Sequence, residues 1–130
     1  MLIDIGVNLS NSRFEKDREA VLKRAQEAGV ERLILTGTSI AESQTVVDIC
    51  DQYADQFPGM LNATAGIHPH DASGYSRESA TALRTLAQHP SVVSIGETGL
   101  DFNRNLSTEK EQQLSFEAHI ELAIELGMPL

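Results

Sequence analysis

Short apolar runs alternate with longer amphipathic stretches along the chain. The apolar runs cover residues 2–7, 32–36, 60–67 and 92–96, and they recur at roughly 30-residue intervals, the length of one strand–helix unit with its return loop. Each run is followed by a stretch in which apolar residues recur at helical spacing. The pattern predicts four β-strands alternating with four α-helices, and this alternation is typical of a parallel sheet with right-handed crossovers.

Start and stop signals bound the expected helices. Gly29 is expected to stop the first helix, and Pro90 lies just beyond the third. Capping boxes are expected at Ser39 with Glu42 and at Thr108 with Glu111. The positions expected to face the core are Phe14, Val21, Ala25 and Ala28, then Val46, Val47, Cys50, Tyr53, Ala54 and Phe57, then Leu83, Leu86 and Ala87, and finally Phe116, Ile120, Ala123 and Ile124.

Two architectures share this order of elements, an open doubly wound sheet and a (β/α)8 barrel, and the repeat alone does not choose between them. No Gly-x-Gly-x-x-Gly follows the first strand, which disfavours a dinucleotide-binding sheet. Residues 125–130 repeat the helix stop and strand start of residues 27–30. The pattern therefore predicts that a fifth strand begins at the end of the sequence. We expect residues 1–130 to be the N-terminal half of one TIM-barrel domain, truncated after about four βα units.

The carboxyl ends of the expected strands are polar, and functional groups gather at these ends in βα folds. Because strand side chains alternate between faces, Asp4, Gly6 and Asn8 should share one face of the first strand. Ile3, Ile5 and Val7 should share the other face. The third strand divides in the same way, with Asn62, Thr64, Gly66 and His68 opposite Leu61, Ala63, Ala65 and Ile67. A small, polar face toward the interior favours a catalytic barrel.

Imidazoles and carboxylates cluster at the third and fourth strand ends, at His68, His70, Asp71, Glu97 and Asp101. Together they suit a divalent first-row metal or, with added water, Mg²⁺ or Mn²⁺. Other interpretations stay open. His-Pro-His is also typical of a turn with solvated imidazoles, and Glu97 could pair with Arg104. Asp4 could cap a loop, and Asn8 could be a turn residue.

Three further residues are expected to be structural rather than catalytic. His119 falls inside the fourth helix and His89 at the end of the third, where a cation suits the helix dipole. Both are expected to be structural or solvent-exposed. Cys50 lies on the buried stripe of its helix and is expected to be a small core residue.

Composition and charge narrow the class of protein. Of 130 residues, 41% are hydrophobic and 22% charged, which is typical of a globular domain. The N-terminus does not have the pattern of a signal peptide, and no apolar run has the ~20 residues of a membrane span. With one cysteine, no disulfide framework is expected and a cytoplasmic location is the default. The net charge of −9 argues against a DNA-binding module more than against a metallonuclease, because bound metal inverts the local field.

The strand-end motifs resemble those of the TatD family of metal-dependent deoxyribonucleases. The resemblance runs along the whole chain through Asp4-Ile-Gly-Val-Asn8, Thr36-Gly-Thr38, Gly66-Ile-His-Pro-His-Asp71 and Gly96-Glu-Thr-Gly-Leu-Asp101-Phe-Asn-Arg104, and the last two motifs are the specific ones. It implies a TIM barrel about twice this length. It also implies one or two divalent metals, usually Mg²⁺ with Mn²⁺ or Zn²⁺ as alternatives, and 3′–5′ exonuclease hydrolysis of DNA, single-stranded DNA being the expected substrate.

The resemblance also implies roles for individual residues. Glu97 would bridge the metals, with Asp4 and His68 as further ligands. His68 and His70 would contact metal or substrate phosphate and act in catalysis with Glu97. The supporting or substrate-binding residues would be Asn8, Asp71, Asp101 and Arg104.

One departure and one absence qualify this resemblance. Many family members have His-x-His where this chain has Gly6-Val-Asn8, so a first metal should bind more weakly. The remaining family ligands, two histidines and an aspartate, would lie beyond Leu130. Two rival functions stay open: an amidohydrolase or phosphotriesterase-like hydrolase of small molecules, and an inactive half-barrel that self-associates. The full-length form is expected to be a monomer without membrane association.

Overall fold

The computed structural model describes residues 1–130. Its strands are β1 (Leu2–Val7), β2 (Val30–Leu35), β3 (Leu61–Ala65) and β4 (Val92–Ile95). Its α-helices are α1 (Arg18–Glu27), α2 (Ile40–Tyr53), α3 (Arg77–Leu86) and α4 (Glu109–Leu126). Two short 3₁₀ helices, η1 (Ser12–Phe14) and η2 (Pro69–Gly74), lie between them. The predicted strands and helices are confirmed, in the predicted order.

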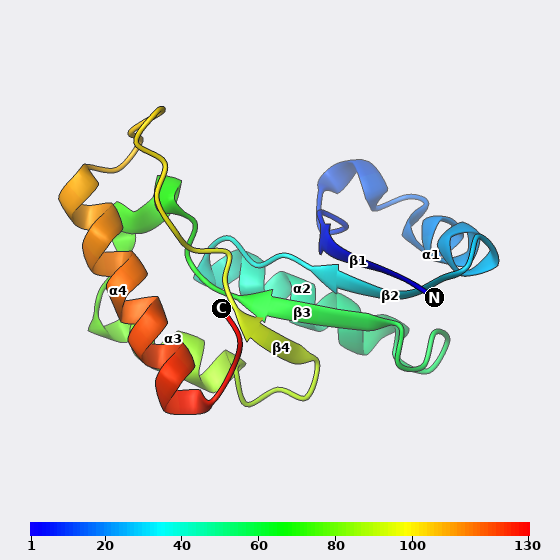
Figure 1. Ribbon diagram of the computed structural model, residues 1–130. Helices are drawn as coiled ribbons and strands as arrows, with labels where there is room; N and C mark the ends of the chain where they lie inside the picture. The colour runs from blue at the N-terminus through cyan, green and yellow to red at the C-terminus, as the bar shows by residue number, and fades with distance from the viewer.

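The strands form one parallel sheet in the order β1-β2-β3-β4. A doubly wound sheet reverses its strand order at a switch point, and this sheet has no reversal. Figure 1 shows α2 behind β2 and β3, while no helix crosses the face of the sheet toward the viewer. Sequential parallel strands with one face uncovered are the arrangement of half a (β/α)8 barrel, as predicted.

The hydrophobic core fills the space between the sheet and the helices. Leu35 and Ala63 from the sheet are fully buried there, as are Val46 of α2 and Leu83 of α3. Cys50 also belongs to this core, and burial raises the pKa of its thiol to about 11. The prediction that Cys50 is a core residue is confirmed by this burial. A thiol with so high a pKa is also a poor nucleophile at neutral pH.

Capping side chains fix where the helices begin. Thr108 and Glu111 form the predicted reciprocal capping box at the start of α4. At α2, the Ser39 side chain accepts the backbone N–H of Glu42. This is one of the two hydrogen bonds of the predicted capping box. Ser76 and Ser79 form a further box at α3, where the third residue is a serine in place of the usual Glu or Gln.

The predicted alternation holds for β3 but not for β1. Asn62 and Thr64 line the open face of the sheet while Leu61, Ala63 and Ala65 are buried. In β1, however, Ile3 and Ile5 lie on that open face, and Asp4 pairs with the core residue Leu33. The pairing of β1 with β2 shifts register between Asp4 and Val7. Such an irregularity reverses the alternation, so the shared face predicted for Ile3, Ile5 and Val7 is wrong.

Of the face predicted for α4, Ala123 is buried, but the rest of the prediction is wrong. Its buried residues are Gln112, Ser115, His119, Leu122 and Ala123, whereas Ile124 is 76% exposed. The helix packs against η2 and β4, and two polar members of this face, Gln112 and His119, bond to backbone groups of the neighbouring loops. A stripe read from hydrophobicity alone misses a face whose burial depends on hydrogen bonds.

The C-terminal residues lie beside β4. The N–H of Ile95 donates to the carbonyl of Pro129 at 2.9 Å, and the Ser94 hydroxyl donates to the same oxygen at 3.1 Å. Figure 1 shows the C-terminus next to β4, on the side away from β3. This is where the next strand of a barrel would begin. None of the helices combines the length and the apolar character that crossing a bilayer requires.

Candidate active site

A pocket of about 560 Å³ opens where the strands end on the uncovered face of the sheet. Its lining includes Thr36 after β2, Thr64 of β3 and Ser94 of β4. Glu97 and Thr98 follow β4 and enter the same pocket, which Phe116 of α4 borders. Polar residues at the ends of β2, β3 and β4 therefore meet at one cavity, while His68, His70 and Asp101 lie outside its lining.

A close approach of two glycines places Glu97 at this pocket. A Cβ atom on Gly66, at the end of β3, would collide with the backbone of Gly96. Because Gly66 has no side chain, the chain after β4 crosses over β3, and the N–H of Glu97 donates to the carbonyl of Gly37 at 2.7 Å. The backbone at Glu97 is thereby fixed to the end of β2. Its carboxylate is left 48% exposed at the pocket.

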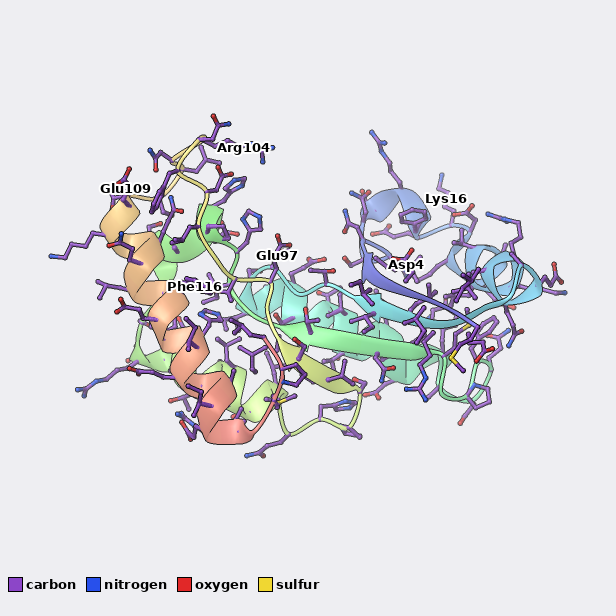
Figure 2. The ribbon with its side chains drawn as sticks, in the orientation of Figure 1. Asp4, Lys16, Glu97, Arg104, Glu109 and Phe116 are labelled. Atoms are coloured by element: carbon purple, nitrogen blue, oxygen red, sulfur yellow. The ribbon has the colours of Figure 1, made fainter.

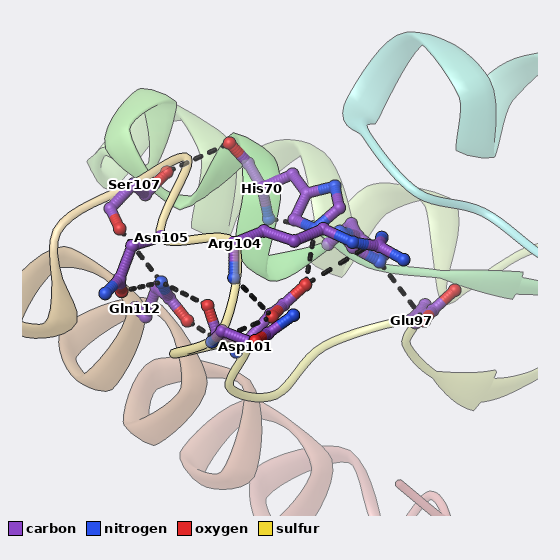
Figure 3. Close-up of polar contacts among 9 residues, drawn as sticks. His70, Glu97, Asp101, Arg104, Asn105, Ser107 and Gln112 are labelled. Atoms are coloured by element: carbon purple, nitrogen blue, oxygen red, sulfur yellow. Dashed lines mark hydrogen bonds and ion pairs between the residues drawn. The ribbon is translucent and has the colours of Figure 1, made fainter.

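Two histidine–carboxylate pairs lie next to each other at the strand ends. Nε2 of His68 lies 3.4 Å from Oε1 of Glu97, and Nε2 of His70 lies 2.7 Å from Oδ2 of Asp101. The two imidazole rings meet edge to face with centroids 4.2 Å apart. Figure 3 shows His70 against Asp101, with Glu97 in the same view. The alternative partner for Glu97, Arg104, is wrong: Arg104 instead lies 3.9 Å from Asp101.

The His-Pro-His segment is a turn, as one interpretation expected, but its imidazoles are not simply solvated. Pro69 begins η2, and His68 caps it by accepting the N–H of His70 at Nδ1, 3.0 Å away. Only about a fifth of each side chain is exposed, 22% for His68 and 23% for His70. The turn thus holds both rings against the carboxylates.

The loop after β4 is fastened to α4 by a side chain that the sequence pattern did not indicate. The amide of Gln112, 1% exposed, accepts the N–H of Asp101 at 2.7 Å and donates to the carbonyls of Asp101 and Ser107. Ser107 in turn donates to the carbonyl of His70 at 3.0 Å. Gln112 therefore joins the loop, η2 and α4 (Figure 3). The sequence carried no signal for this role, because the burial of Gln112 appears only in the structure.

The charge on Asp101 is stabilised by its partners. The hydrogen bond from His70, then that from the Arg104 N–H, hold the pKa of the Asp101 carboxyl below its usual value. Asp101 is therefore ionised at neutral pH, which makes it an acceptor for the His70 ring.

The other predicted site residues lie apart from these pairs. Asp4, on β1, accepts the N–H of Gly6 at 3.2 Å, the loop-capping contact that one interpretation expected. Figure 2 shows Asp4 on β1, apart from Glu97, which lies in the loop after β4. Asn8 accepts from the Ser10 hydroxyl at 3.5 Å, and Asp71 is exposed on η2. Arg104 extends into solvent with 65% of its side chain exposed.

His119 and His89 are structural, as predicted. His119 is fully buried, donates from Nδ1 to the carbonyl of Ser115 and accepts the N–H of Ile67 at Nε2, 3.0 Å away. His89 bonds Ser91 and Asp51 at the opposite ends of the strands. The contact from His119 to Ile67 fixes the backbone one residue before His68.

No three imidazole, thiol or carboxylate groups of the chain are gathered closely enough to hold a metal ion. Glu97 supplies one carboxylate at the pocket. The Thr98 hydroxyl in the same lining is buried and has no hydrogen-bond partner. Oxygen donors of this kind suit Mg²⁺, so these residues fit part of a divalent-cation site.

Half a parallel barrel with carboxylates and imidazoles at its strand ends places the chain among (β/α)8 barrel proteins whose sites lie at the carboxyl ends of the strands. Comparison with known proteins gives the particular family. The profile described as "TatD related DNase" matches residues 3–130, and the chain belongs to this family.

Curated relatives and solved structures agree with the profile. The chain is 50% identical over 129 residues to the "3'-5' ssDNA/RNA exonuclease TatD" of Musicola paradisiaca and, over the same length, to that of Pantoea vagans. These matches cover 99% of this chain and 47% and 48% of the relatives. The chain therefore spans about half the length of the curated relatives it matches.

Two crystal structures show the same fold in this half. A TatD-family hydrolase from Entamoeba histolytica aligns with a TM-score of 0.87 at 27% identity, covering 95% of this chain and 46% of that one. YjjV, a TatD homologue from Escherichia coli K12, aligns with a TM-score of 0.82 at 29% identity, covering 98% of this chain and 48% of its own. The four βα units of this chain thus have the same fold as about half of each of these two proteins.

Proposed function

We propose that the full-length protein hydrolyses phosphodiester bonds of single-stranded DNA, releasing nucleotides from the 3′ end with the help of a divalent metal. The observation that supports this most directly is the placement of Glu97 at the strand-end pocket, paired with His68. The names of the curated relatives, which include ssDNA and RNA, indicate the substrate class.

In this proposal Glu97 holds a metal, Mg²⁺ in the first instance, next to the hydroxyl of Thr98. Bound there, a divalent cation would lower the pKa of a coordinated water and neutralise charge on the phosphate. Gly6 lines the pocket from β1 but has no ligating side chain, and Asp4, which caps the local loop outside the pocket lining, is not assigned to the metal. Further ligands would come from segments outside residues 1–130.

His68 is proposed to act on the phosphate rather than as a metal ligand. The Nδ1 lone pair of His68 is occupied by the N–H of His70, so we assign His68 a donor role at Nε2 toward Glu97 and the phosphate. Arg104, exposed beside Asp101, would add positive charge near the substrate backbone. Such local charges matter because the chain as a whole has a net charge of −9 and would otherwise repel a polyanion.

Replacing Glu97 with Ala in the full-length protein tests the proposal. We expect nucleotide release from labelled single-stranded DNA with Mg²⁺ to fall on the order of 100-fold or more, since loss of a ligand removes several kcal/mol of charge stabilisation. Glu117→Ala, at an exposed position of α4, makes the same change outside the pocket and should leave the rate unaltered.

Two results would contradict the proposal. Normal activity of Glu97→Ala would remove Glu97 from the metal site. Hydrolysis of simple esters or amides, without hydrolysis of DNA, would favour the small-molecule hydrolase instead.

A further inference from the structure

One ring nitrogen of His68, Nδ1, is committed to a backbone hydrogen bond. A backbone N–H can only donate, so the bond from His70 N–H to Nδ1 of His68 requires that Nδ1 carry no proton. The neutral ring then has its proton on Nε2, which lies 3.4 Å from Oε1 of Glu97. His68 therefore presents an N–H near Glu97 and has no free lone pair.

The ring nitrogens of His70 are committed differently. Asp101 is an ionised acceptor 2.7 Å from Nε2 of His70, so that nitrogen carries the proton. The other hydrogen bonds of His70 use its backbone N–H and its carbonyl oxygen. Its Nδ1 lone pair remains free on a ring that is 23% exposed.

The carboxylate of Asp101 cannot easily turn away from this role. One of its oxygens, Oδ1, accepts the N–H groups of Asn103 and Arg104 at 3.2 and 3.1 Å, which directs Oδ2 toward His70. Behind it, Gln112 holds the backbone N–H of Asp101 at 2.7 Å. The carboxylate, the backbone and the helix thus fix the tautomer of one imidazole.

We infer that His70 is the proton acceptor of this site, working through Nδ1, and that Asp101 is the positioning residue that keeps its proton on Nε2. The inference rests on the proposed phosphodiester hydrolysis. A water proton passes to Nδ1 while the water oxygen forms its bond to phosphorus. The bond from phosphorus to the leaving oxygen breaks with its electron pair, and that oxygen takes a proton from solvent. The resulting imidazolium of His70 is stabilised by Asp101, 2.7 Å from its Nε2.

An Asp101→Asn substitution tests the assignment because the neighbouring backbone N–H groups determine how the new amide is oriented. The amide oxygen of the new side chain must occupy the position facing the N–H groups of Asn103 and Arg104, so its NH₂ group faces His70. That group donates to Nε2 and moves the His70 proton to Nδ1, where it blocks proton acceptance. Asp55→Asn makes the same change of charge at an exposed position and serves as the control.

The experiment uses full-length protein with ¹⁵N-labelled histidine. Long-range ¹H–¹⁵N spectra should show the proton of both His68 and His70 on Nε2 in the wild type, and the His70 proton on Nδ1 in Asp101→Asn. The kcat on single-stranded DNA with Mg²⁺ should fall by about 10²- to 10⁴-fold, the usual contribution of general acid–base catalysis, with KM changed far less. Asp55→Asn should match the wild type in both measurements.

The outcomes distinguish the proposed hydrolysis from the proton-acceptor role of His70. An inactive wild type would overturn the proposed function and the base role together. An active wild type with the His70 proton on Nδ1 would overturn the inference alone, as would an Asp101→Asn variant that moves the proton and keeps the wild-type kcat. If Asp101→Asn does not fold, as circular dichroism would show, the wild-type tautomer of His70 decides.

Discussion

His119 is a buried imidazole at the contact between α4 and the turn that carries His68. Desolvation lowers the pKa of its ring from the ordinary 6.5, and the bond to the Ser115 carbonyl offsets only part of this effect. Nε2 must also stay unprotonated to accept the N–H of Ile67. The folded protein therefore requires the neutral ring.

This requirement predicts a pH-dependent stability. The unfolded chain binds a proton at His119 below about pH 6.5 while the folded chain does not, so the free energy of unfolding is largest above that pH. It should decrease as the pH falls from 6.5 toward the lower folded pKa, by up to about 1.4 kcal/mol per pH unit. The lowered pKa values of Asp101 and Glu111 change the free energy of unfolding only at more acidic pH. Urea unfolding between pH 5 and 8 measures the slope.

Substitution of the histidine isolates its contribution. His119→Gln can accept and donate at similar positions without titrating, so its slope between pH 5 and 6.5 should be shallower than that of the wild type. His89→Gln is the matched control, because the His89 ring is partly exposed. Equal slopes in the wild type and His119→Gln would assign the pH dependence to other groups.

At the scale of the elements, the sequence predicts the parts whose burial follows hydrophobicity. The strands and most of the core face of α2 follow the spacing of apolar residues, and the structure contains them. The exception on that face is Ala54, which is exposed. The structure differs where a hydrogen bond or a register shift decides the side. The irregular pairing of β1 moves Ile3 and Ile5 to the open face, and Gln112 and His119 are buried because they bond to loop backbone.

The site was predictable to a similar depth. Because parallel strand ends meet at one edge, the motifs alone bring Glu97, His68 and His70 together. The pairing within that group depends on the close approach of Gly66 and Gly96 and on the η2 turn, and neither leaves a periodic signal in the sequence. For the same reason the role of Gln112 became visible only in the folded chain.

Helix α4 is expected to act as the anchor of the loop after β4. In Gln112→Leu the helix should persist, since Leu is a strong helix former, but the N–H of Asp101 and the carbonyl of Ser107 lose a partner. We expect the free energy of unfolding to fall by about 2–4 kcal/mol, because each unpaired buried group costs about 1–3 kcal/mol. Hydrogen exchange at Asp101 should also accelerate.

Gln113→Leu is the control for this substitution, because the neighbouring glutamine is exposed. It should change the stability by no more than about 0.5 kcal/mol. If both variants behave alike, the loop does not depend on α4 in the way the hydrogen bonds indicate.

At the scale of the whole molecule, the uncovered face of the sheet is the surface that a complete barrel would enclose. Ile3 is 48%, Ile5 75% and Leu130 55% exposed around a second pocket of about 510 Å³. β1 also has an unpaired edge, since it pairs only with β2. Exposed apolar surface next to a free strand edge favours association between chains.

The 130-residue chain in isolation is therefore expected to self-associate through this face at micromolar concentration. Analytical ultracentrifugation should show a mass that rises with concentration, and Ile5→Lys should shift the distribution toward monomer, because a charge there would be desolvated in the contact. Ile124→Lys replaces an equally exposed isoleucine on α4 and should leave the association unchanged. A chain that remains monomeric at every concentration would contradict the prediction, and an equal effect of both substitutions would assign the contact to general hydrophobicity instead of the barrel interior.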